Sequence, residues 1–282
     1  MSAPEILDNA VSLRARVRDW RASGETIALV PTMGALHAGH ISLTRLAREK
    51  ARRVIVSIFV NPAQFAPGED FSKYPRTFDA DCAKLAAAGV DAVYAPGGAD
   101  MYPPGFSTTV SLSGPASAGL EDRFRPAHFA GVATVVAKLH IQCMPDIAFY
   151  GEKDFQQLAV IRQMTSDLDL PIEVLGGPTI REGDGLALSS RNVYLDAAQR
   201  KTAPVLHATM RDCAKAIRAG GPQDNVMERG RAAIAAAGFA LDYLELRDAI
   251  TLGEADIASG RALRMLVAAR IGATRLIDNI AV

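Results

Sequence analysis

The stretch IALVPTMGALHAGHISLTRLAREKARRVIVSIFV, residues 27–60, decides the fold class of this chain. It opens with a short apolar run, passes through a loop containing glycine and histidine, and continues with Leu43, Leu46 and Ala47 at helical spacing. It ends in RVIVSIFV, which is β-branched or apolar at nearly every position, as is typical of a strand buried on both faces of a parallel sheet. The order strand, loop, helix, strand predicts one unit of an α/β fold.

The same alternation extends beyond this unit in both directions. Strands that alternate with helices of such lengths indicate a Rossmann-like, doubly wound parallel sheet. We expect helices over residues 11–22, from about 41, near 79–88, around 130–143 and near 155–167, and strands over 27–30, 53–60, 90–95, 146–151 and 172–177.

Two stretches interrupt this rhythm. Residues 96–120 are rich in Gly, Pro and Ser, which suits an irregular excursion that covers a site. Residues 176–185 resemble a domain joint. After them come helical segments (197–219 and 224–237) and then strand-like segments (241–248, 262–271 and 274–282). We therefore expect a larger domain over residues 1–179 and a smaller α+β C-terminal domain over residues 180–282.

Composition narrows the class of protein. The 282 residues carry 31 Lys and Arg against 31 Asp and Glu, which argues against a long nucleic-acid-binding surface. The three cysteines form no CxxC pair, which favours reduced thiols. The N-terminus has Glu5 and Asp8 where a signal peptide would be basic, and no apolar run approaches the roughly 18 residues of a membrane span. We expect a cytoplasmic protein that binds neither nucleic acid nor membrane.

The chain lacks a P-loop, a dinucleotide fingerprint, a zincin helix and an esterase elbow, so its chemistry must use something else. The motif HAGH at residues 37–40 lies between a predicted strand and a predicted helix. At that place in an open α/β sheet, the helix N-terminus offers free N–H groups to an anion. His37 and His40 can donate hydrogen bonds to phosphate oxygens, and Gly39 lets the backbone approach a bulky ligand. A zinc pair or packed loop histidines remain alternatives for the motif by itself.

Further motifs give this one its context. PTMGALHAGH (31–40) is followed in order by SIFVNPAQF (57–65), YPRT (74–77), HFAGV (128–132), GEKDFQQL (151–158) and LSSRN (188–192). Together these segments resemble the pantothenate synthetases, the pantoate–β-alanine ligases of the HxGH nucleotidylyltransferase superfamily. The resemblance runs from about residue 26 to LIDN at 276–279.

The resemblance implies a fold of the HxGH nucleotidylyltransferase type and a two-step reaction. The carboxylate of (R)-pantoate attacks the α-phosphorus of ATP, pyrophosphate leaves, and β-alanine then displaces AMP from the acyl adenylate. Residues 1–179 would bind nucleotide and pantoate, and residues 180–282 would form a lid. The resemblance also implies Mg²⁺ as the companion of ATP, and a homodimer.

The resemblance assigns ATP-binding roles to several blocks. His37, His40, Lys153 and Arg191 would be catalytic, with His40 in the position described as the proton donor and Asp154 on the ribose. The expected nucleotide contacts are Met33, Gly34, Ala35, Leu36, His37, Ala38, Gly39, His40, Gly151, Glu152, Lys153, Asp154, Ile180, Leu188, Ser189, Ser190 and Arg191.

The same resemblance assigns the acid substrates. Gln64 and Gln157 would bind pantoate through their amides, and Asn61 and His128 would line the substrate region nearby. Tyr74 is expected at the mouth of the site. Asp81 is a candidate magnesium contact, although its position in the sequence fits the exposed face of a helix better.

Other functions remain compatible with the sequence. One is a nucleotidylyltransferase that acts on another small acceptor, or a synthetase-like protein that passes the acyl group to RNA. Balanced charge and the lack of an anticodon-type domain weigh against RNA. A third is a silent sensor that binds ATP without producing AMP.

Overall fold

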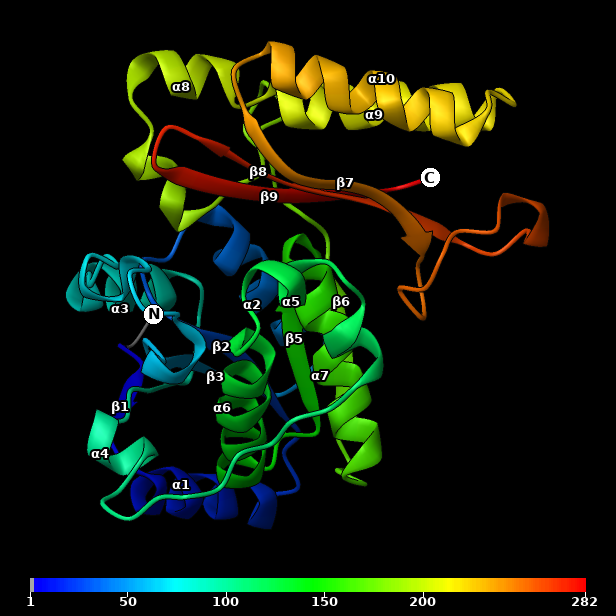
Figure 1. The fold of residues 1–282 in the computed structure, drawn as a ribbon. Helices are drawn as coiled ribbons and strands as arrows, with labels where there is room; N and C mark the ends of the chain where they lie inside the picture. The colour runs from blue at the N-terminus through cyan, green and yellow to red at the C-terminus, as the bar shows by residue number, and fades with distance from the viewer. Residues whose placement is uncertain (1–2) are drawn as a thin grey trace.

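Two sheets organise the computed structural model, which describes residues 3–282 (Figure 1). The larger has six parallel strands in the spatial order β1–β4–β3–β2–β5–β6. Its strands are β1 (Glu5–Leu7), β2 (Ile27–Thr32), β3 (Arg53–Ile58), β4 (Ala92–Tyr94), β5 (Ile147–Gly151) and β6 (Glu173–Gly177). The predicted doubly wound parallel sheet is confirmed.

Helices cover both faces of this sheet, and the packing of β2 explains why its buried residues, 27–30, are all apolar. Ile27 and Leu29 pack with one group of helices, whereas Ala28 and Val30 pack with the other. The first group is α1 (Ala10–Ala22), α6 (His128–Cys143) and α7 (Phe155–Asp167), and the second is α2 (Ala38–Lys50) and α3 (Phe78–Ala87). A strand covered on both faces has no solvent side that would select polar residues.

The strand order reverses at β2, which lies between β3 and β5. The chain leaves β2 toward α2 and β3, whereas β5 lies on its other side. The connections that leave the carboxyl ends of β2 and β5 therefore diverge and leave a crevice between them. From these two connections, Met33, His37, His40, Lys153 and Asp154 line a common cavity.

The second sheet is antiparallel, with strands β7 (Ala240–Asp248), β8 (Leu263–Ile271) and β9 (Thr274–Ala281) in that order. Its outer face packs on α9 (Val205–Arg218) and α10 (Gln223–Ala236), above the sheet in Figure 1. Along β8 the residues alternate, so that Met265 and Val267 face these helices while Leu266 and Ala268 face the other way. The predicted α+β tail is confirmed.

Three local expectations need correction, and one strand was not predicted. The strand β1, which pairs with β4, lies upstream of the first predicted element. The helix expected over 197–219 is two helices, α8 (Ala197–Thr202) and α9, because Pro204 follows α8 and cannot continue its hydrogen bonding. The proposed joint at 176–185 begins inside β6, which ends at Gly177. The predicted excursion (96–120) contains a short helix, α4 (Gly98–Met101), and precedes α5 (Glu121–Phe124).

Among residues 3–282, no helix is both long and apolar enough to cross a membrane.

Candidate active site

A cavity of about 920 Å³ lies between the carboxyl ends of the large sheet and the second sheet. Its wall contains His37, His40, Lys153 and Arg191, the four side chains on which the phosphate hypothesis depends. It also contains these other predicted site residues: Met33, Gly39, Asn61, Gln64, Tyr74, His128, Gly151, Asp154, Gln157, Ile180, Leu188, Ser189 and Ser190. The fold thus brings one group of candidates together from separate sequence blocks.

Six predicted residues stand outside the lining: Gly34, Ala35, Leu36, Ala38, Glu152 and Asp81. The excursion 96–120 likewise contributes no lining residue, so the expectation that it covers the site is wrong. It packs instead beside α6, where Val110 donates its N–H to Thr134 at 2.9 Å.

The loop after β2 owes its shape to one buried carboxylate. Gly34 and Ala35 both have positive φ, 81° and 50°, and a Cβ at Gly34 would meet Ile58 at 3.2 Å. Asp81 accepts the N–H groups of Ala35 and Leu36 at 2.9 and 2.8 Å and the hydroxyl of Thr77 at 3.0 Å. Asp81 is fully buried, so the exposed helix face expected for it is wrong. Its oxygens are engaged by the loop, and a metal would have to displace those contacts.

The two motif histidines orient each other through local hydrogen bonds. Nδ1 of His37 accepts the N–H of Gly39 at 3.2 Å and caps α2, while Nδ1 of His40 accepts the N–H of His37 at 3.3 Å. An imidazole that accepts at Nδ1 carries its hydrogen on Nε2. The ring centroids are 4.1 Å apart. Both rings therefore offer an Nε2–H donor at the helix N-terminus.

Both histidines are neutral near pH 7. Burial, and then the charge of Lys153, lower the pKa of His37 to about 4. Burial, then His37 and then Lys153, lower the pKa of His40 to about 3. Before any anion binds, His40 therefore acts as a hydrogen-bond donor and holds no ionisable proton to give away at neutral pH. Lys153 lines the same cavity as the two rings, and its charge lowers the pKa of both.

Lys153 and Asp154 follow β5 in a short 3-10 helix, Glu152–Asp154. Lys153 Nζ lies 3.7 Å from the Asp154 carboxylate. Asn279 from β9, only 2% exposed, donates to the carbonyls of Glu152 at 2.9 Å and Lys153 at 2.8 Å. The Glu152 side chain turns away to Arg264 on β8, at 3.2 Å. The C-terminal LIDN block thus supports the backbone of GEKD.

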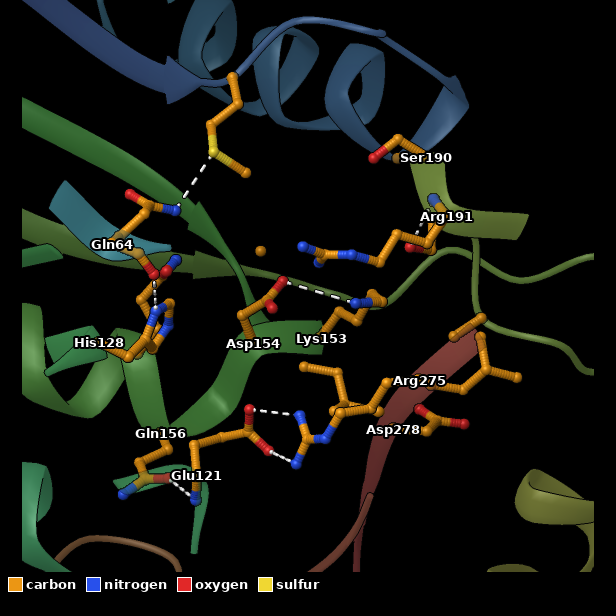
Figure 2. A pocket seen from close by; sticks show the side chains of 18 of the residues that line it. Gln64, Glu121, His128, Lys153, Asp154, Gln156, Ser190, Arg191, Arg275 and Asp278 are labelled. Carbon is orange, nitrogen blue, oxygen red and sulfur yellow. Dashed lines mark hydrogen bonds and ion pairs between the residues drawn. The ribbon is translucent and has the colours of Figure 1, made fainter. Parts of the chain in front are cut away.

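Arg191 and Ser190 lie in the 3-10 helix Ser190–Tyr194, which Ser189 caps by accepting the N–H of Arg191 at 3.2 Å. Figure 2 shows Lys153 and Asp154 reaching the cavity from one segment and Arg191 reaching it from another. Tyr74, expected at the mouth, is 5% exposed, and its hydroxyl lies 3.0 Å from Ser190 Oγ. Tyr74 therefore contacts and supports the Ser190 segment.

Gln64, one of the two amides that could hold an organic acid, lies across the cavity from Arg191 (Figure 2), and Gln157 on α7 also lines the cavity. Gln64 Nε2 contacts Met33 Sδ at 3.2 Å, and its Oε1 accepts from Asn61 at 3.1 Å (Figure 2 shows the first contact). Asn61 is 1% exposed and also contacts Gly131 and Tyr102, so its hydrogen-bonding capacity is used within the protein. Asn61 orients Gln64, and the Gln64 amide faces the cavity.

His128 is buried and both of its ring nitrogens are engaged by protein. Nε2 lies 3.1 Å from Arg125 Nη1, and Nδ1 lies 3.0 Å from the Gln64 carbonyl. Because Arg125 can only donate, Nε2 accepts and Nδ1–H donates. Burial, then the charge of Arg125, lower the pKa of His128 to about 4. His128 therefore positions the Gln64 segment as a neutral ring.

Several contributors escaped sequence reasoning. Arg125 pairs with Glu69 at 2.7 Å and contacts the Gln64 carbonyl at 3.2 Å, and both residues line the cavity. Asp70 pairs with Arg191 at 2.9 Å. A Cβ at Gly131 would lie 2.1 Å from the Ala63 carbonyl oxygen, so α6 can approach the Gln64 segment only with glycine there. The glycine in HFAGV was a signal that could have indicated this close approach.

Comparisons with known proteins identify the family of this chain. A family model described as pantoate-beta-alanine ligase matches residues 5–281. The chain is 59% identical to pantothenate synthetase 2 of Bradyrhizobium diazoefficiens, over 99% of each chain. It is similar to the crystal structure of the pantothenate synthetase of Thermus thermophilus, with 45% identity, a TM-score of 0.92 and 98% of each chain covered.

A third relative was solved with ligands. The pantoate-beta-alanine ligase of Francisella tularensis, complexed with beta-gamma ATP and beta-alanine, is 33% identical, with a TM-score of 0.82 and coverage of 99% of this chain and 97% of that one. A family match over nearly the whole chain, together with relatives of this identity and coverage, leads to one conclusion: this chain belongs to the pantoate–β-alanine ligase family.

Proposed function

We propose that this enzyme joins (R)-pantoate to β-alanine at the expense of ATP, through a pantoyl adenylate, and releases AMP and pyrophosphate. The observation that carries the proposal is a single cavity lined by two neutral imidazole donors, a lysine, an arginine and the amides Gln64 and Gln157. Family membership supports the ligase reaction, and the composition of the cavity supports the adenylate route.

The chemistry requires an activated carboxylate. A carboxylate resists nucleophiles because it is negatively charged and because oxide is a very poor leaving group. In the first step, a pantoate oxygen bonds to the α-phosphorus of ATP and the bond from that phosphorus to the bridging pyrophosphate oxygen breaks. In the second step, the neutral amine of β-alanine bonds to the acyl carbon, AMP leaves with the bonding electrons, and the nitrogen loses a proton.

Charge and orientation supply most of what the protein contributes to such a reaction. Lys153 and Arg191 would hold the departing pyrophosphate, since a point charge and a planar fork both suit phosphate oxygens. His37 and His40 would donate through Nε2, at the end of α2 where the helix dipole also favours an anion. Phosphate charge beside the rings would raise their pKa values from about 4 and about 3.

The acid substrate would lie across the cavity from the triphosphate. Gln64 and Gln157 can each donate and accept hydrogen bonds, which suits the hydroxyl and carboxylate groups of pantoate. Apolar lining residues, including Met33, Val132 and Val136, suit its gem-dimethyl group. Asp154, whose side chain is 44% exposed, would accept hydrogen bonds from ribose hydroxyls.

Magnesium is proposed as the ion carried by the ATP phosphates, whose charge it neutralises when bound. Such an ion needs only one or two protein carboxylates besides phosphate and water oxygens. Within residues 3–282 no three His, Cys, Asp or Glu side chains gather as metal ligands. The phosphates of ATP would therefore supply most of the ligands of the ion. Asp81 already accepts hydrogen bonds from the loop after β2.

Residues 180–282 are proposed to form a lid over residues 1–179. Supporting this division, the joining segment follows β6, and cavity-lining residues come from both sides of it. Ion pairs connect the two parts, among them Arg275 with Glu121 at 2.7 Å and Arg264 with Glu152 at 3.2 Å. A lid that excludes water would protect the acyl adenylate from hydrolysis.

We also propose a homodimer in the cytoplasm. The homodimer rests on the family resemblance, and the unbridged cysteines Cys82, Cys143 and Cys213 suit a reducing compartment. Sedimentation equilibrium of the purified protein would test the first statement, with a mass near 30.0 kDa contradicting it.

The deciding experiment supplies ATP, MgCl₂, (R)-pantoate and β-alanine and follows AMP, pyrophosphate and pantothenate. We expect equal amounts of the three products. Without β-alanine, exchange of labelled pyrophosphate into ATP should persist and should require pantoate. AMP transfer to pantoate that never proceeds to the amide would indicate a nucleotidylyltransferase, and ATP binding without AMP would indicate a sensor.

A further inference from the structure

We propose that Asp70 is a positioning residue that aims Arg191 at the phosphates of ATP. Asp70 begins the 3-10 helix Asp70–Ser72, and Arg191 lies 121 residues further along the chain. The inference rests on the proposed function, because it assigns a supporting residue to the arginine that would hold pyrophosphate. Both residues line the cavity.

The geometry of the pair leaves the arginine able to bind a second anion. Arg191 Nε donates to one Asp70 oxygen at 3.0 Å, and Nη2 donates to the other at 2.9 Å. A guanidinium has five N–H donors, so this side-on contact leaves three of them. Within residues 3–282, Nη1 has no hydrogen-bond partner. Asp70 therefore fixes one edge of the guanidinium and leaves another edge for phosphate.

Two further contacts join the same pair of segments. The Tyr74 hydroxyl lies 3.0 Å from Ser190 Oγ, and the Tyr194 hydroxyl donates to the Lys73 carbonyl at 3.1 Å. The segment 70–74 is itself braced by Phe65, whose ring packs against Phe71 and Tyr74 with centroid distances of 5.4 and 6.1 Å. The rings of Phe65, Phe71 and Tyr74 therefore form one aromatic cluster that supports the backbone of Asp70.

The charges are compatible with this role. Burial acts to raise the pKa of Asp70, but the hydrogen bonds and charge of Arg191 outweigh it and hold that pKa below its usual range. Asp70 is thus ionised near pH 7, and the pair is neutral as a unit. A long arginine side chain that is already oriented loses less freedom when phosphate binds. The alternative is that Asp70 competes with phosphate for Arg191, and it predicts the opposite effect on ATP affinity.

The test is a double-mutant cycle with Asp70→Asn, Arg191→Ala and both together, measured by pantoate-dependent pyrophosphate exchange and by ATP binding calorimetry. We expect Asp70→Asn to raise KM and Kd for ATP about tenfold, while KM for pantoate changes less than about twofold. In the Arg191→Ala background, Asp70→Asn should have no further effect, because Asp70 acts through Arg191. Asp70→Glu should restore part of the ATP affinity.

Asp19→Asn is the matched control, since Asp19 also faces an arginine, at 3.8 Å, but its side chain is 72% exposed and does not line the cavity. Additive effects of Asp70→Asn and Arg191→Ala, or tighter ATP binding by Asp70→Asn, would overturn the proposal. Thermal melting checks that each variant folds. If Asp70→Asn does not fold, the same measurements are made on Asp70→Glu. Absence of exchange in the unmodified enzyme would reject the ligase reaction instead, while calorimetry would still decide the role of Asp70.

Discussion

The imidazole pair and the cation pair in this cavity are held in different ways. His37 and His40 are oriented by hydrogen bonds that span two or three residues of the chain. Lys153 and Arg191 depend on partners more than a hundred residues away: Asn279 supports the backbone around Lys153, and Asp70 holds Arg191. The first pair can therefore be recognised as a short motif, whereas the second exists as a site only in the folded chain.

Replacing Lys153 with Ala tests the remote pair most directly. The loss of one point charge that meets developing phosphate charge should lower pyrophosphate exchange by about 100- to 1,000-fold. Lys201→Ala, an exposed lysine on α8, is the control and should leave the rate unchanged. A Lys153→Ala variant that retains a third of the activity would remove the lysine from the proposed mechanism.

Asn279→Ala would break the remote support while leaving Lys153 in place. Two buried carbonyls would lose their donor, which costs about 1–3 kcal/mol of the free energy of unfolding, and kcat/KM for ATP should fall about tenfold. Chemical denaturation and exchange kinetics measure the two effects. Asn225→Ala on α10, an exposed position, serves as the control. Unchanged kinetics would mean that the GEKD segment keeps its conformation without the hydrogen bonds from Asn279.

Asp81→Asn probes whether the imidazole pair is as self-sufficient as its local contacts imply. An amide has one oxygen acceptor, so a backbone N–H of Ala35 or Leu36 would lose its partner, at about 1–2 kcal/mol of stability. We expect KM for ATP to rise several-fold with no change in the magnesium dependence. Asp79→Asn, exposed on the same helix, is the control. A shifted magnesium requirement would return Asp81 to the role of metal ligand.

Acid should weaken the fold through histidines outside the motif as well. Burial, with Arg125 adding to it at His128, lowers the pKa of His128 and His140 from 6.5 to about 4. Between these values the unfolded chain binds protons that the folded chain does not, so stability is lost as pH falls from about 6.5 toward 4. At pH 5.5 each buried histidine should cost about 1 kcal/mol relative to pH 7.5.

Denaturation curves at several pH values measure this slope, and His140→Asn should flatten it. His140 is fully buried and contacts the Tyr150 hydroxyl at 2.8 Å, so it suits a role in the core. If stability depends on pH equally in His140→Asn and in the unmodified chain, buried His140 does not contribute to the loss of stability in acid.

The difference between the two pairs also describes how far sequence analysis reached. The apolar runs of β2 and β3 predicted the parallel sheet correctly, and the motif HAGH lies at the start of a helix, as expected. Local helix periodicity placed Asp81 on an exposed helix face, and the family resemblance placed Tyr74 at the cavity mouth, but both side chains are buried. Sequence analysis also gave no sign of Asp70 or Arg125, which become part of the site through contacts with distant segments.

The sequence by itself determined the alternation of strands and helices, the motif at the end of β2 and the family. These follow from hydrophobic periodicity and from short spacings, which act within a few residues. Only the tertiary structure decided which face of α3 is buried, that Asn279 supports Lys153, and that Asp70 leaves one edge of Arg191 open. Those outcomes depend on which distant segments form hydrogen bonds and buried ion pairs with one another. The order of neighbouring residues does not show which distant segments will meet.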